Sequence, residues 1–445
     1  MTANVGVQLD AIETTAVRRI TTRLIPFLMA CYFVAFLDRV NVGFAALQMN
    51  KDLGFSSTVY GWGAGIFFLA YFVFEVPSNL LMERVGARLW IARIMISWGL
   101  VSAGMAMVHG AGSFYLVRLL LGVAEAGFFP GVILYLTYWF PREHRARIVG
   151  LFMLAIPISN FLGSPVSAAL LGVDGVLGLR GWQWLFLLEA VPAVALGVAT
   201  LFLLPDGPAK AAWLPAAERD WLRTRLAEET AASGRHARMP VWEVLKHPRV
   251  LLLALAYAGS TATNYGLTYF QPLMIKSFGL STMQTGLLNA IPFGLGAVAM
   301  VLWGRRSDRK RERVWHTSLP LALSALGLLA CVVFTTLTPT IIALCVTLIG
   351  CYALKGPFWA LSTEWLPASS AAAAIAQINA LGNLAGFVGP FLLGWLTDLT
   401  GSYALGLLPM VALAAIAAVA VQLAGRRGAA ETGARAEERA AAVRG

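Results

Sequence analysis

The chain has 445 residues, of which 58% are hydrophobic and only 13% are charged. An ordinary soluble domain carries about 25% charged residues, so this sequence has too few of them to cover a soluble surface. The formal net charge is +11, but the basic residues lie in short clusters between long apolar runs, as positive-inside topology requires. The composition therefore excludes a soluble globular protein and predicts a membrane protein surrounded by lipid, with no nucleic-acid partner.

The apolar runs predict the fold class. A membrane-spanning helix needs about 20 apolar residues, and the sequence contains twelve such runs. They cover residues 24–47, 59–82, 89–109, 113–138, 147–170, 183–204, 250–274, 284–303, 315–335, 340–361, 371–394 and 402–424. We therefore expect an all-α membrane protein with twelve transmembrane helices in two six-helix repeats.

The only long hydrophilic segment separates the two sets of six runs. We expect an N-terminal bundle over 1–204, a linker over 205–249, a C-terminal bundle over 250–424 and a disordered tail over 425–445. Within the linker, Trp221, Leu222 and Leu226 fall on one side of a helix amid charged residues, which predicts an amphipathic surface helix. An even number of spans places both termini on one side, and the basic clusters make that side the cytoplasm.

Two basic loops at matched places suggest an internal duplication. Glu83, Arg84 and Arg88 lie between spans 2 and 3, and Asp308 and Arg309 lie between spans 8 and 9, about half the chain further on. Secondary transporters are commonly built from such repeats, with the substrate site near the midplane. Positive-inside charge alone also explains a short basic loop, but an acid among the bases in both halves favours duplication.

Four charged residues fall inside predicted spans: Asp38 and Arg39 in span 1, and Arg118 and Glu125 in span 4. Each costs roughly 2.5–3.5 kcal/mol at a helix centre if it faces lipid, so they are expected to face protein or water. One interpretation is structural, in which the four charges neutralise one another and join the two spans. The other is functional: Arg39 and Arg118 hold an anion, and Asp38 and Glu125 exchange arginine partners for protons, which couples anion to proton binding.

Other polar residues in the spans carry less specific predictions. Glu75 and Glu189 are assigned to span ends, as a lock or an interfacial contact, and Lys355 is either a substrate contact or a side chain that reaches the interface. The uncharged candidates for contacts to hydroxyl groups or a ring are Tyr71, Asn160, Tyr265, Tyr269, Gln271, Gln377, Asn379 and Asn383. Each of them can equally be a helix-packing contact.

Enzyme and metal motifs are missing from the sequence. It contains no HExxH, GxSxG or Walker A pattern, and its four cysteines lie in apolar runs without metal-ligand spacing. We therefore expect no enzymatic activity, no metal and no cofactor other than a proton as coupling ion.

The motifs resemble those of the major facilitator superfamily, and within it the anion:cation symporter family, over nearly the whole chain. The segments that carry the resemblance are Leu37-Asp38-Arg39-Val40-Asn41, Phe74-Glu75-Val76-Pro77-Ser78-Asn79, Arg118 through Gly131, Lys355 through Leu361 and Asn379 through Asn383. Family members include bacterial proton symporters for phthalate, tartrate and sugar acids. The loop between spans 2 and 3 departs from the usual pattern, because Asn79 replaces a glycine and Glu83 an aspartate.

The resemblance implies roles for particular residues. Asp38 and Glu125 match the carboxyl groups that are protonated during transport, and Arg39 and Arg118 match the paired arginines near the substrate. Tyr71 matches a tyrosine that can contact substrate.

We therefore expect a monomeric transporter in the bacterial inner membrane that moves a small organic anion inward with protons by alternating access. The alternatives are an exchanger or uniporter of the same fold and a transporter-like ligand sensor.

Overall fold

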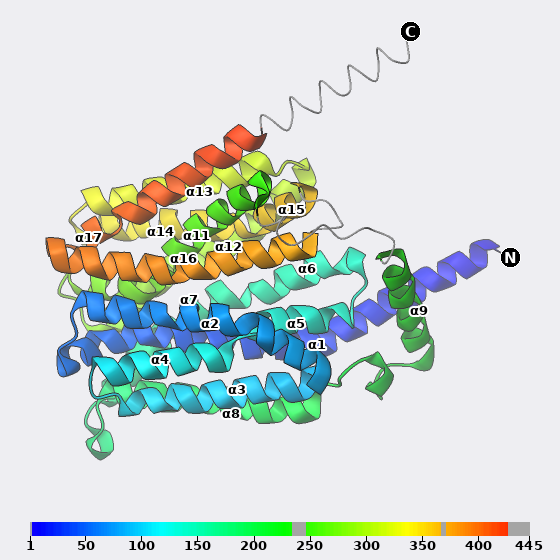
Figure 1. Ribbon diagram of the computed structural model, residues 1–445, viewed down its shortest axis with the longest axis horizontal. Helices are drawn as coiled ribbons and strands as arrows, with labels where there is room; N and C mark the ends of the chain where they lie inside the picture. The colour runs from blue at the N-terminus through cyan, green and yellow to red at the C-terminus, as the bar shows by residue number, and fades with distance from the viewer. Residues whose placement is uncertain (1, 234–245, 366–370, 426–445) are drawn as a thin grey trace, which may run out of the picture. The chain divides into compact units, whose positions relative to one another are not determined.

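The computed structural model describes residues 2–233, 246–365 and 371–425, and every regular element in these ranges is a helix (Figure 1). The predicted all-α class is therefore confirmed. The chain divides into two compact units: unit 1 is Met1–Ala237 with Thr268–Ala290, and unit 2 is Arg238–Leu267 with Ile291–Gly445. The predicted domain boundaries at 204, 249 and 424 stay predictions, and nearly all of the predicted tail lies outside the described residues.

The helices that precede the linker, and the linker helix itself, belong to unit 1. They are α1 (Thr2–Leu53), α2 (Ser57–Val85), α3 (Ala87–Gly104), α4 (Ala111–Glu125), α5 (Phe128–Thr137), α6 (Arg142–Met153), α7 (Ala155–Leu170), α8 (Gly181–Leu203) and α9 (Ala216–Ser233). Short 3₁₀ turns cover Met105–Met107, Leu171–Val173, Val176–Gly178 and Pro208–Lys210.

The remaining helices follow the linker. They are α11 (Pro248–Lys276), α12 (Thr282–Lys310), α13 (Val314–Val333), α14 (Leu337–Ala353), α15 (Lys355–Trp365), α16 (Ala371–Thr400) and α17 (Tyr403–Gly406), with a helix that continues to Gly425. The C-terminal part of α11 and the first turns of α12 belong to unit 1, and the rest of these helices belongs to unit 2.

Eleven helical segments of the described chain are long and apolar enough to cross a membrane, and they match predicted spans 1–6 and 8–12. Large apolar side chains such as Phe202, Leu302 and Val333 are exposed on them, as lipid-facing helices require. The seventh predicted span forms the helix α11, but α11 is not among the eleven. The buried residues of α11 include Ser260, Thr263 and Gln271. These polar side chains face protein, which explains why α11 is less apolar than the other helices. Helix α11 corresponds to the seventh of the twelve predicted spans.

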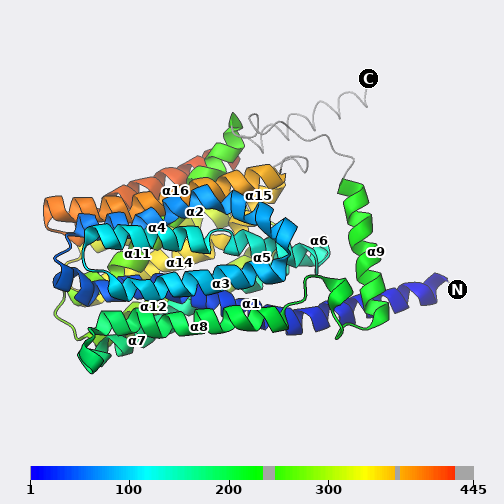
Figure 2. The ribbon, with the colours of Figure 1, turned by 60° about the horizontal axis from the view of Figure 1, so that its bottom comes forward.

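Helices α3 and α8 lie side by side in unit 1 (Figures 1 and 2). Glycines on both helices permit this: a Cβ atom on Gly99 would lie 2.8 Å from Val194, and one on Gly197 would lie 2.8 Å from Ile96. Small residues let helix backbones approach closely, which is how membrane helices pack without a hydrophobic driving force. The pair brings Trp98 and Ser102 on α3 close to the interior of unit 1.

The span predicted over 113–138 is present over Ala111–Thr137, but its helix is interrupted. Helix α4 ends at Glu125, and α5 begins at Phe128 after Ala126 and Gly127. Gly127 has φ 87°, a left-handed conformation that glycine adopts without steric strain. A Cβ atom there would also collide with the side chain of Ser78. The break therefore places the Glu125 side chain at the C-terminal end of a half-helix.

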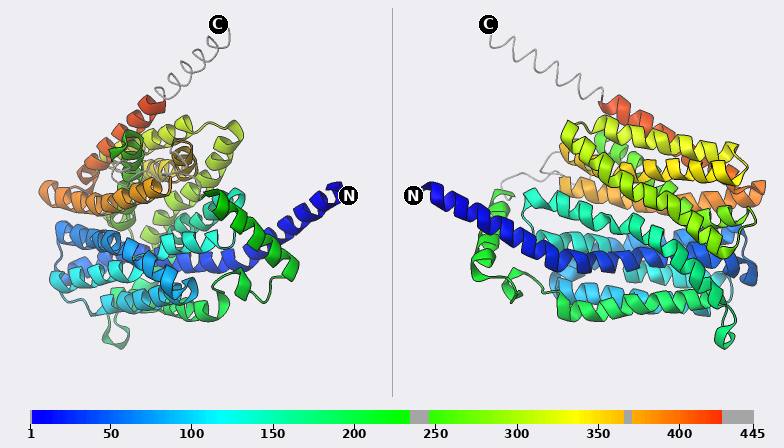
Figure 3. Two further views of the ribbon diagram at one scale, coloured as in Figure 1. Left: turned by 45° about the vertical axis from the view of Figure 1, so that its right-hand side comes forward. Right: turned by 180° about the vertical axis from the view of Figure 1, so that it is seen from behind.

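The linker helix α9 lies across α1 (Figure 3). Ion pairs hold it against α1 and α6. Arg19 on α1 bonds Glu218 at 3.1 Å, and Leu222 of the predicted apolar side is fully buried. On α6, Glu143 bonds Arg225 at 3.0 Å. The predicted amphipathic helix is thus present, and its apolar side packs within unit 1.

In unit 2, α13 and α14 pack side by side (Figure 1). The interior of unit 2 contains an apolar cluster of residues from α11, α13, α15 and α16, including Leu253, Leu321, Phe358 and Ile378. Among the described residues of unit 2, Lys355 is the buried lysine, and no arginine, aspartate or glutamate of this part of the chain is buried.

Candidate functional site

Arg39 and Glu125 form an ion pair that joins α1 to the C-terminal end of α4. Both side chains are buried, and the Arg39 guanidinium also lies over the Phe36 ring, 4.4 Å from its centroid. A buried arginine is stabilised by a carboxylate partner, so each group compensates the charge of the other. Of the four charges predicted to neutralise one another, these two do so.

Arg118 has different surroundings, although it lies two turns before Glu125 on α4. Its guanidinium is fully buried and donates to the carbonyl oxygens of Gly63 (3.1 Å) and Ala64 (3.0 Å) and to the Tyr269 hydroxyl group (3.2 Å). It forms no ion pair with a described carboxylate, and its Nη1 atom has no hydrogen-bond partner among the described residues. The Phe67 ring lies 5.0 Å from it. Arg118 is thus a buried cation that neutral groups hold in place.

Asp38 is not paired with its neighbour Arg39, which corrects the expected network of four charges. Its carboxylate accepts hydrogen bonds from the Trp98 indole, from Ser102 (3.2 Å) and from Asn41 (3.2 Å). Consecutive residues of a helix point about 100° apart, so Asp38 and Arg39 face different neighbours. Asp38 therefore lies in a pocket of neutral donors between α1 and α3.

Glu189 also differs from its prediction as a span-end residue. It lies in the middle of α8, is 3% exposed, and accepts a hydrogen bond from Ser167 at 2.9 Å. The sequence analysis assigns Glu189 to a lock or an interfacial contact near a span end, whereas the structure buries it inside α8.

A row of amide side chains lies where α7, α11 and α12 meet in unit 1. Asn289 donates to Ser164 at 2.8 Å, and Gln271 donates to the Asn289 carbonyl oxygen at 3.4 Å. Asn160 lies one turn before Ser164. The amide oxygens of Asn160, Gln271 and Asn289 have no hydrogen-bond partner in the described part of the chain. The sequence predicted Asn160 and Gln271 but missed Ser164 and Asn289, which carry no charge or motif.

The predicted site residues divide between the two units. Tyr71 is buried on α2 in unit 1, and Tyr269 holds Arg118 there, as described above. In unit 2, Lys355 is buried at the start of α15 with its Nζ atom 5.2 Å from the centroid of the Tyr257 ring. The half-buried residues of unit 2 from the predicted set are Tyr265, Gln377, Asn379 and Asn383.

The predicted gate residues lie at exposed or half-buried ends of helices. Asp308 bonds Arg313 at 2.8 Å, and Arg313 also bonds Glu364 at 3.3 Å. In the other loop, the Arg88 amide donates to Asp206 at 3.4 Å. Across the described residues, the remaining three, Glu83, Arg84 and Arg309, form no ion pair. The two loops are therefore held differently within their own units.

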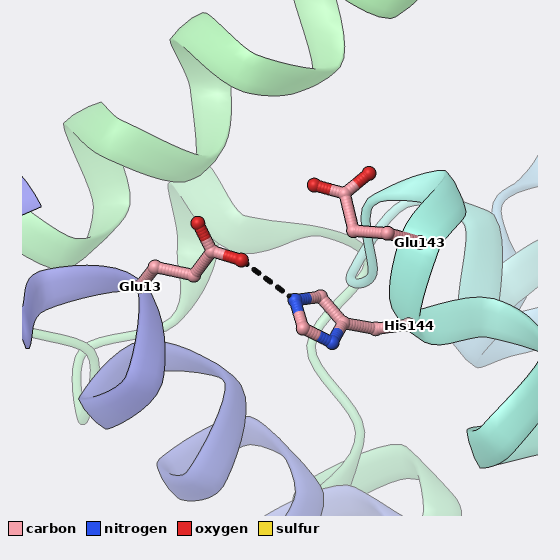
Figure 4. Close-up of side chains that lie close together, drawn as sticks. All are labelled: Glu13, Glu143 and His144. Atoms are coloured by element: carbon pink, nitrogen blue, oxygen red, sulfur yellow. Dashed lines mark hydrogen bonds and ion pairs between the residues drawn. The ribbon is translucent and has the colours of Figure 1, made fainter. Parts of the chain in front are cut away.

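One group of possible metal ligands lies near the linker helix. The ligand atoms of Glu13, Glu143 and His144 lie within 4.8 Å of one another, and Figure 4 shows the Glu13 carboxylate pointing at the His144 ring, 2.8 Å away. Glu143 is already paired with Arg225. Because each of the three groups has an ionic partner, the arrangement acts as an ion-pair cluster that joins α1, α6 and α9.

Comparison with known proteins identifies the class. The sequence matches the Major Facilitator Superfamily over residues 28–390, so the chain belongs to this family of membrane transporters and is a multi-pass membrane protein. The bacterial "Putative tartrate transporter" of Agrobacterium vitis is 53% identical over 408 residues, which cover 92% of this chain and 94% of that protein. A "Quinolone resistance transporter" of Acinetobacter baumannii is 43% identical, over 89% of this chain and 91% of that protein.

Solved structures agree on the fold. The bacterial homolog to the human lysosomal transporter Spinster, in an inward-facing and unoccupied conformation, matches with a TM-score of 0.74 and 17% sequence identity. The match covers 92% of this chain and 97% of that chain. The predicted twelve-helix major facilitator fold is consistent with this match. The family match and the relatives show that the chain is a transporter, not an enzyme.

Proposed function

We propose that this chain is a secondary active transporter for the proton-coupled uptake of an organic carboxylate by alternating access. The observation that carries the proposal is Arg118: a fully buried guanidinium with neutral partners and an Nη1 atom without a partner among the described residues. Arg118 forms no ion pair with a described carboxylate, so its charge is compensated less closely than that of Arg39, and an anion that reaches it is stabilised there. A carboxylate matches the planar donor fork of arginine.

The substrate class proposed is a small hydroxylated acid such as tartrate, with phthalate or a sugar acid as related possibilities. Gln271 lies on α11, the helix whose Tyr269 bonds Arg118. The amide oxygens of Gln271, Asn289 and Asn160 lack donors among the described residues, so they suit the hydroxyl groups of such an acid. The relatives named as tartrate transporters support the same class.

The coupling follows from the pairing of Arg39 with Glu125. While Glu125 is ionised, it holds Arg39. A proton on Glu125 removes that partner and releases Arg39, which then offers a second donor fork to the anion. Anion binding and proton binding therefore favour each other, and by linkage each raises the affinity of the other by the same factor.

The remaining assignments complete the proposal. Asp38 is a second coupling carboxyl group, and Tyr71, Tyr265, Asn379 and Asn383 contact substrate, with Lys355 and Gln377 as secondary candidates. Glu83, Arg84, Arg88, Asp308 and Arg309 form the cytoplasmic gate. The protein works as a monomer in the bacterial inner membrane with both termini in the cytoplasm, and the proton is its only coupling ion.

The test is uptake of labelled tartrate, phthalate, a sugar acid and a quinolone into proteoliposomes, with and without an imposed pH gradient. Tartrate or a related acid should accumulate only with the gradient, and Arg118→Ala should abolish the uptake. Uptake that equilibrates without accumulating would make the protein a uniporter or exchanger. Binding without any transport would make it a ligand sensor, and either result refutes the symport proposal.

A further inference from the structure

Lys355 is a charged residue inside a membrane-spanning segment of unit 2. Helix α14 ends at Ala353 and α15 begins at Lys355 within one apolar span, because Pro357 has no amide hydrogen to donate to the Ala353 carbonyl oxygen. Lys355 lies ten positions before Trp365, the last residue of that span, which is roughly 15 Å along a helix. A lysine side chain is shorter than this distance, and Lys355 is only 7% exposed. The position therefore argues against a side chain that reaches the membrane interface.

The ring of Tyr257 on α11 forms one wall around Lys355. The Lys355 Nζ atom lies 5.2 Å from the centroid of this ring, within the range of a cation–π contact. The ring stacks on that of Phe358 with 5.4 Å between centroids. On the α16 side it needs Gly382, where a Cβ atom would lie 2.2 Å from Tyr257 Cδ1. The packing of three helices therefore fixes the ring beside the ammonium group.

The ring does not use the hydrogen-bonding capacity of Lys355. An ammonium group has three donors, and within the described part of the chain no hydrogen bond or ion pair joins Nζ to another residue. No aspartate or glutamate described in unit 2 is buried, so no internal carboxylate neutralises the charge. A cation inside a membrane protein pairs with an acid or with backbone carbonyl groups, or it marks the path of a substrate. Because the first two partners are missing among the described residues, the third reading is favoured.

Lys355 shares this property with Arg118 of unit 1. Both side chains are buried, and neither forms an ion pair with a described carboxylate. Arg39, by contrast, is paired with Glu125. An acid with one carboxylate group can neutralise one of the two unpaired cations, whereas an acid with two can neutralise both.

We propose that Lys355, beside the Tyr257 ring, binds the second carboxylate group of the transported acid, so that the protein selects diacids over monoacids of the same size. The inference rests on the proposed function and narrows its substrate class. A carboxamide or hydroxyl group in place of the second carboxylate accepts a hydrogen bond but brings no charge, so Lys355 stays without a counter-ion. The selection is therefore made by charge and not by shape.

Calorimetry on the full chain in lipid nanodiscs tests the site with two ligands of nearly equal shape. These are tartrate and tartaric acid monoamide, in which an uncharged carboxamide replaces one carboxylate. The wild type should bind tartrate at least about tenfold more tightly, because hydrogen bonds between charged groups are the stronger ones. Lys355→Met keeps the apolar stem and removes the charge, so tartrate affinity should fall to that of the monoamide, whose own affinity should stay unchanged.

The matched control is Lys310→Met, the same substitution at an exposed lysine of unit 2, which should keep the full preference for tartrate. Equal binding of both ligands by the wild type would overturn the inference without any variant. It is also overturned if Lys355→Met keeps the preference, or if it weakens both ligands equally, as a structural lysine would. If Lys355→Met does not fold, Lys355→Gln takes its place with the same expectations.

Uptake into proteoliposomes separates this inference from the proposed function. If gluconate, a monoacid, accumulates as strongly as tartrate and Lys355→Met changes neither, the inference fails and the proposed function stands. If no acid is accumulated but the binding pattern holds, the proposed transport fails and the diacid site stands.

Discussion

The two buried arginines of unit 1 lie in opposite surroundings. Arg39 has an acid partner, Glu125, and aromatic rings around it. The Arg118 guanidinium also lies near aromatic rings, but its hydrogen bonds go to carbonyl and hydroxyl oxygens, and one of its nitrogens has no hydrogen-bond partner among the described residues. The difference indicates a division of roles: Arg118 is ready for an external anion, and Arg39 becomes available only when Glu125 loses its charge.

The largest effect on stability is expected when one member of the Arg39–Glu125 ion pair is removed. Arg39→Ala leaves Glu125 buried without a counter-charge, so the free energy of unfolding should fall by about 3–5 kcal/mol. Adding Glu125→Gln should restore most of it, because the uncompensated charge is gone. Thermal unfolding in detergent measures both variants. A stable Arg39→Ala protein would mean that the pair contributes little.

Arg118→Ala should act on binding instead. Truncating one member of a buried charge pair costs about 2–5 kcal/mol, or roughly 30-fold to several-thousand-fold in affinity for tartrate. Arg118→Lys should recover little, because an ammonium group lacks the bidentate fork. Calorimetry provides the affinities, with the exposed Arg180→Ala as a control that should bind normally. Equal losses of stability in Arg118→Ala and Arg39→Ala would erase the contrast between the two arginines.

Glu125→Gln should separate binding from coupling. The amide cannot ionise, so the variant should bind and exchange tartrate but fail to accumulate it. If one proton couples to one anion, a gradient of one pH unit drives about tenfold accumulation in the wild type, since one unit corresponds to 1.36 kcal/mol. Uptake into proteoliposomes measures the ratio. Concentrative uptake by Glu125→Gln would remove Glu125 from the mechanism.

The smallest effect is expected when one neutral hydrogen-bond partner of Arg118 is removed. Tyr269→Phe removes one hydrogen bond to the guanidinium, which is worth about 0.5–1.5 kcal/mol, so tartrate affinity should change by roughly two- to tenfold. Tyr352→Phe, on unit 2, is the matched control and should have no effect. An effect as large as that of Arg118→Ala would show that Tyr269 contacts the substrate directly.

The sequence predicted the helices well because each span needs a long apolar run, and this pattern is visible without knowing the packing. It was less successful where the pattern is ambiguous. The break between α4 and α5 depends on the left-handed Gly127, and a glycine in an apolar run is equally compatible with an unbroken helix. The run over 250–274 predicts a span, although α11 is less apolar than the other eleven helical segments.

The candidate site was predictable in its residue types but not in its pairings. Charges inside apolar runs identified Asp38, Arg39, Arg118 and Glu125. Which acid meets which arginine depends on how each helix is rotated about its axis, and no local pattern in one sequence reports that rotation. Glu189 shows the same limit, because its burial and its bond to Ser167 depend on how α8 packs against α7.

The most direct test of the central claim compares tartrate affinity in the wild type and in Glu125→Gln across a range of pH. In the wild type, binding should tighten as pH falls, because a substrate that prefers the protonated form raises its proton affinity by the same factor. Glu125→Gln should bind tightly already at alkaline pH, with a flatter profile, because Arg39 is free at every pH. Weaker binding in the variant at alkaline pH, or an unchanged slope, would contradict the account.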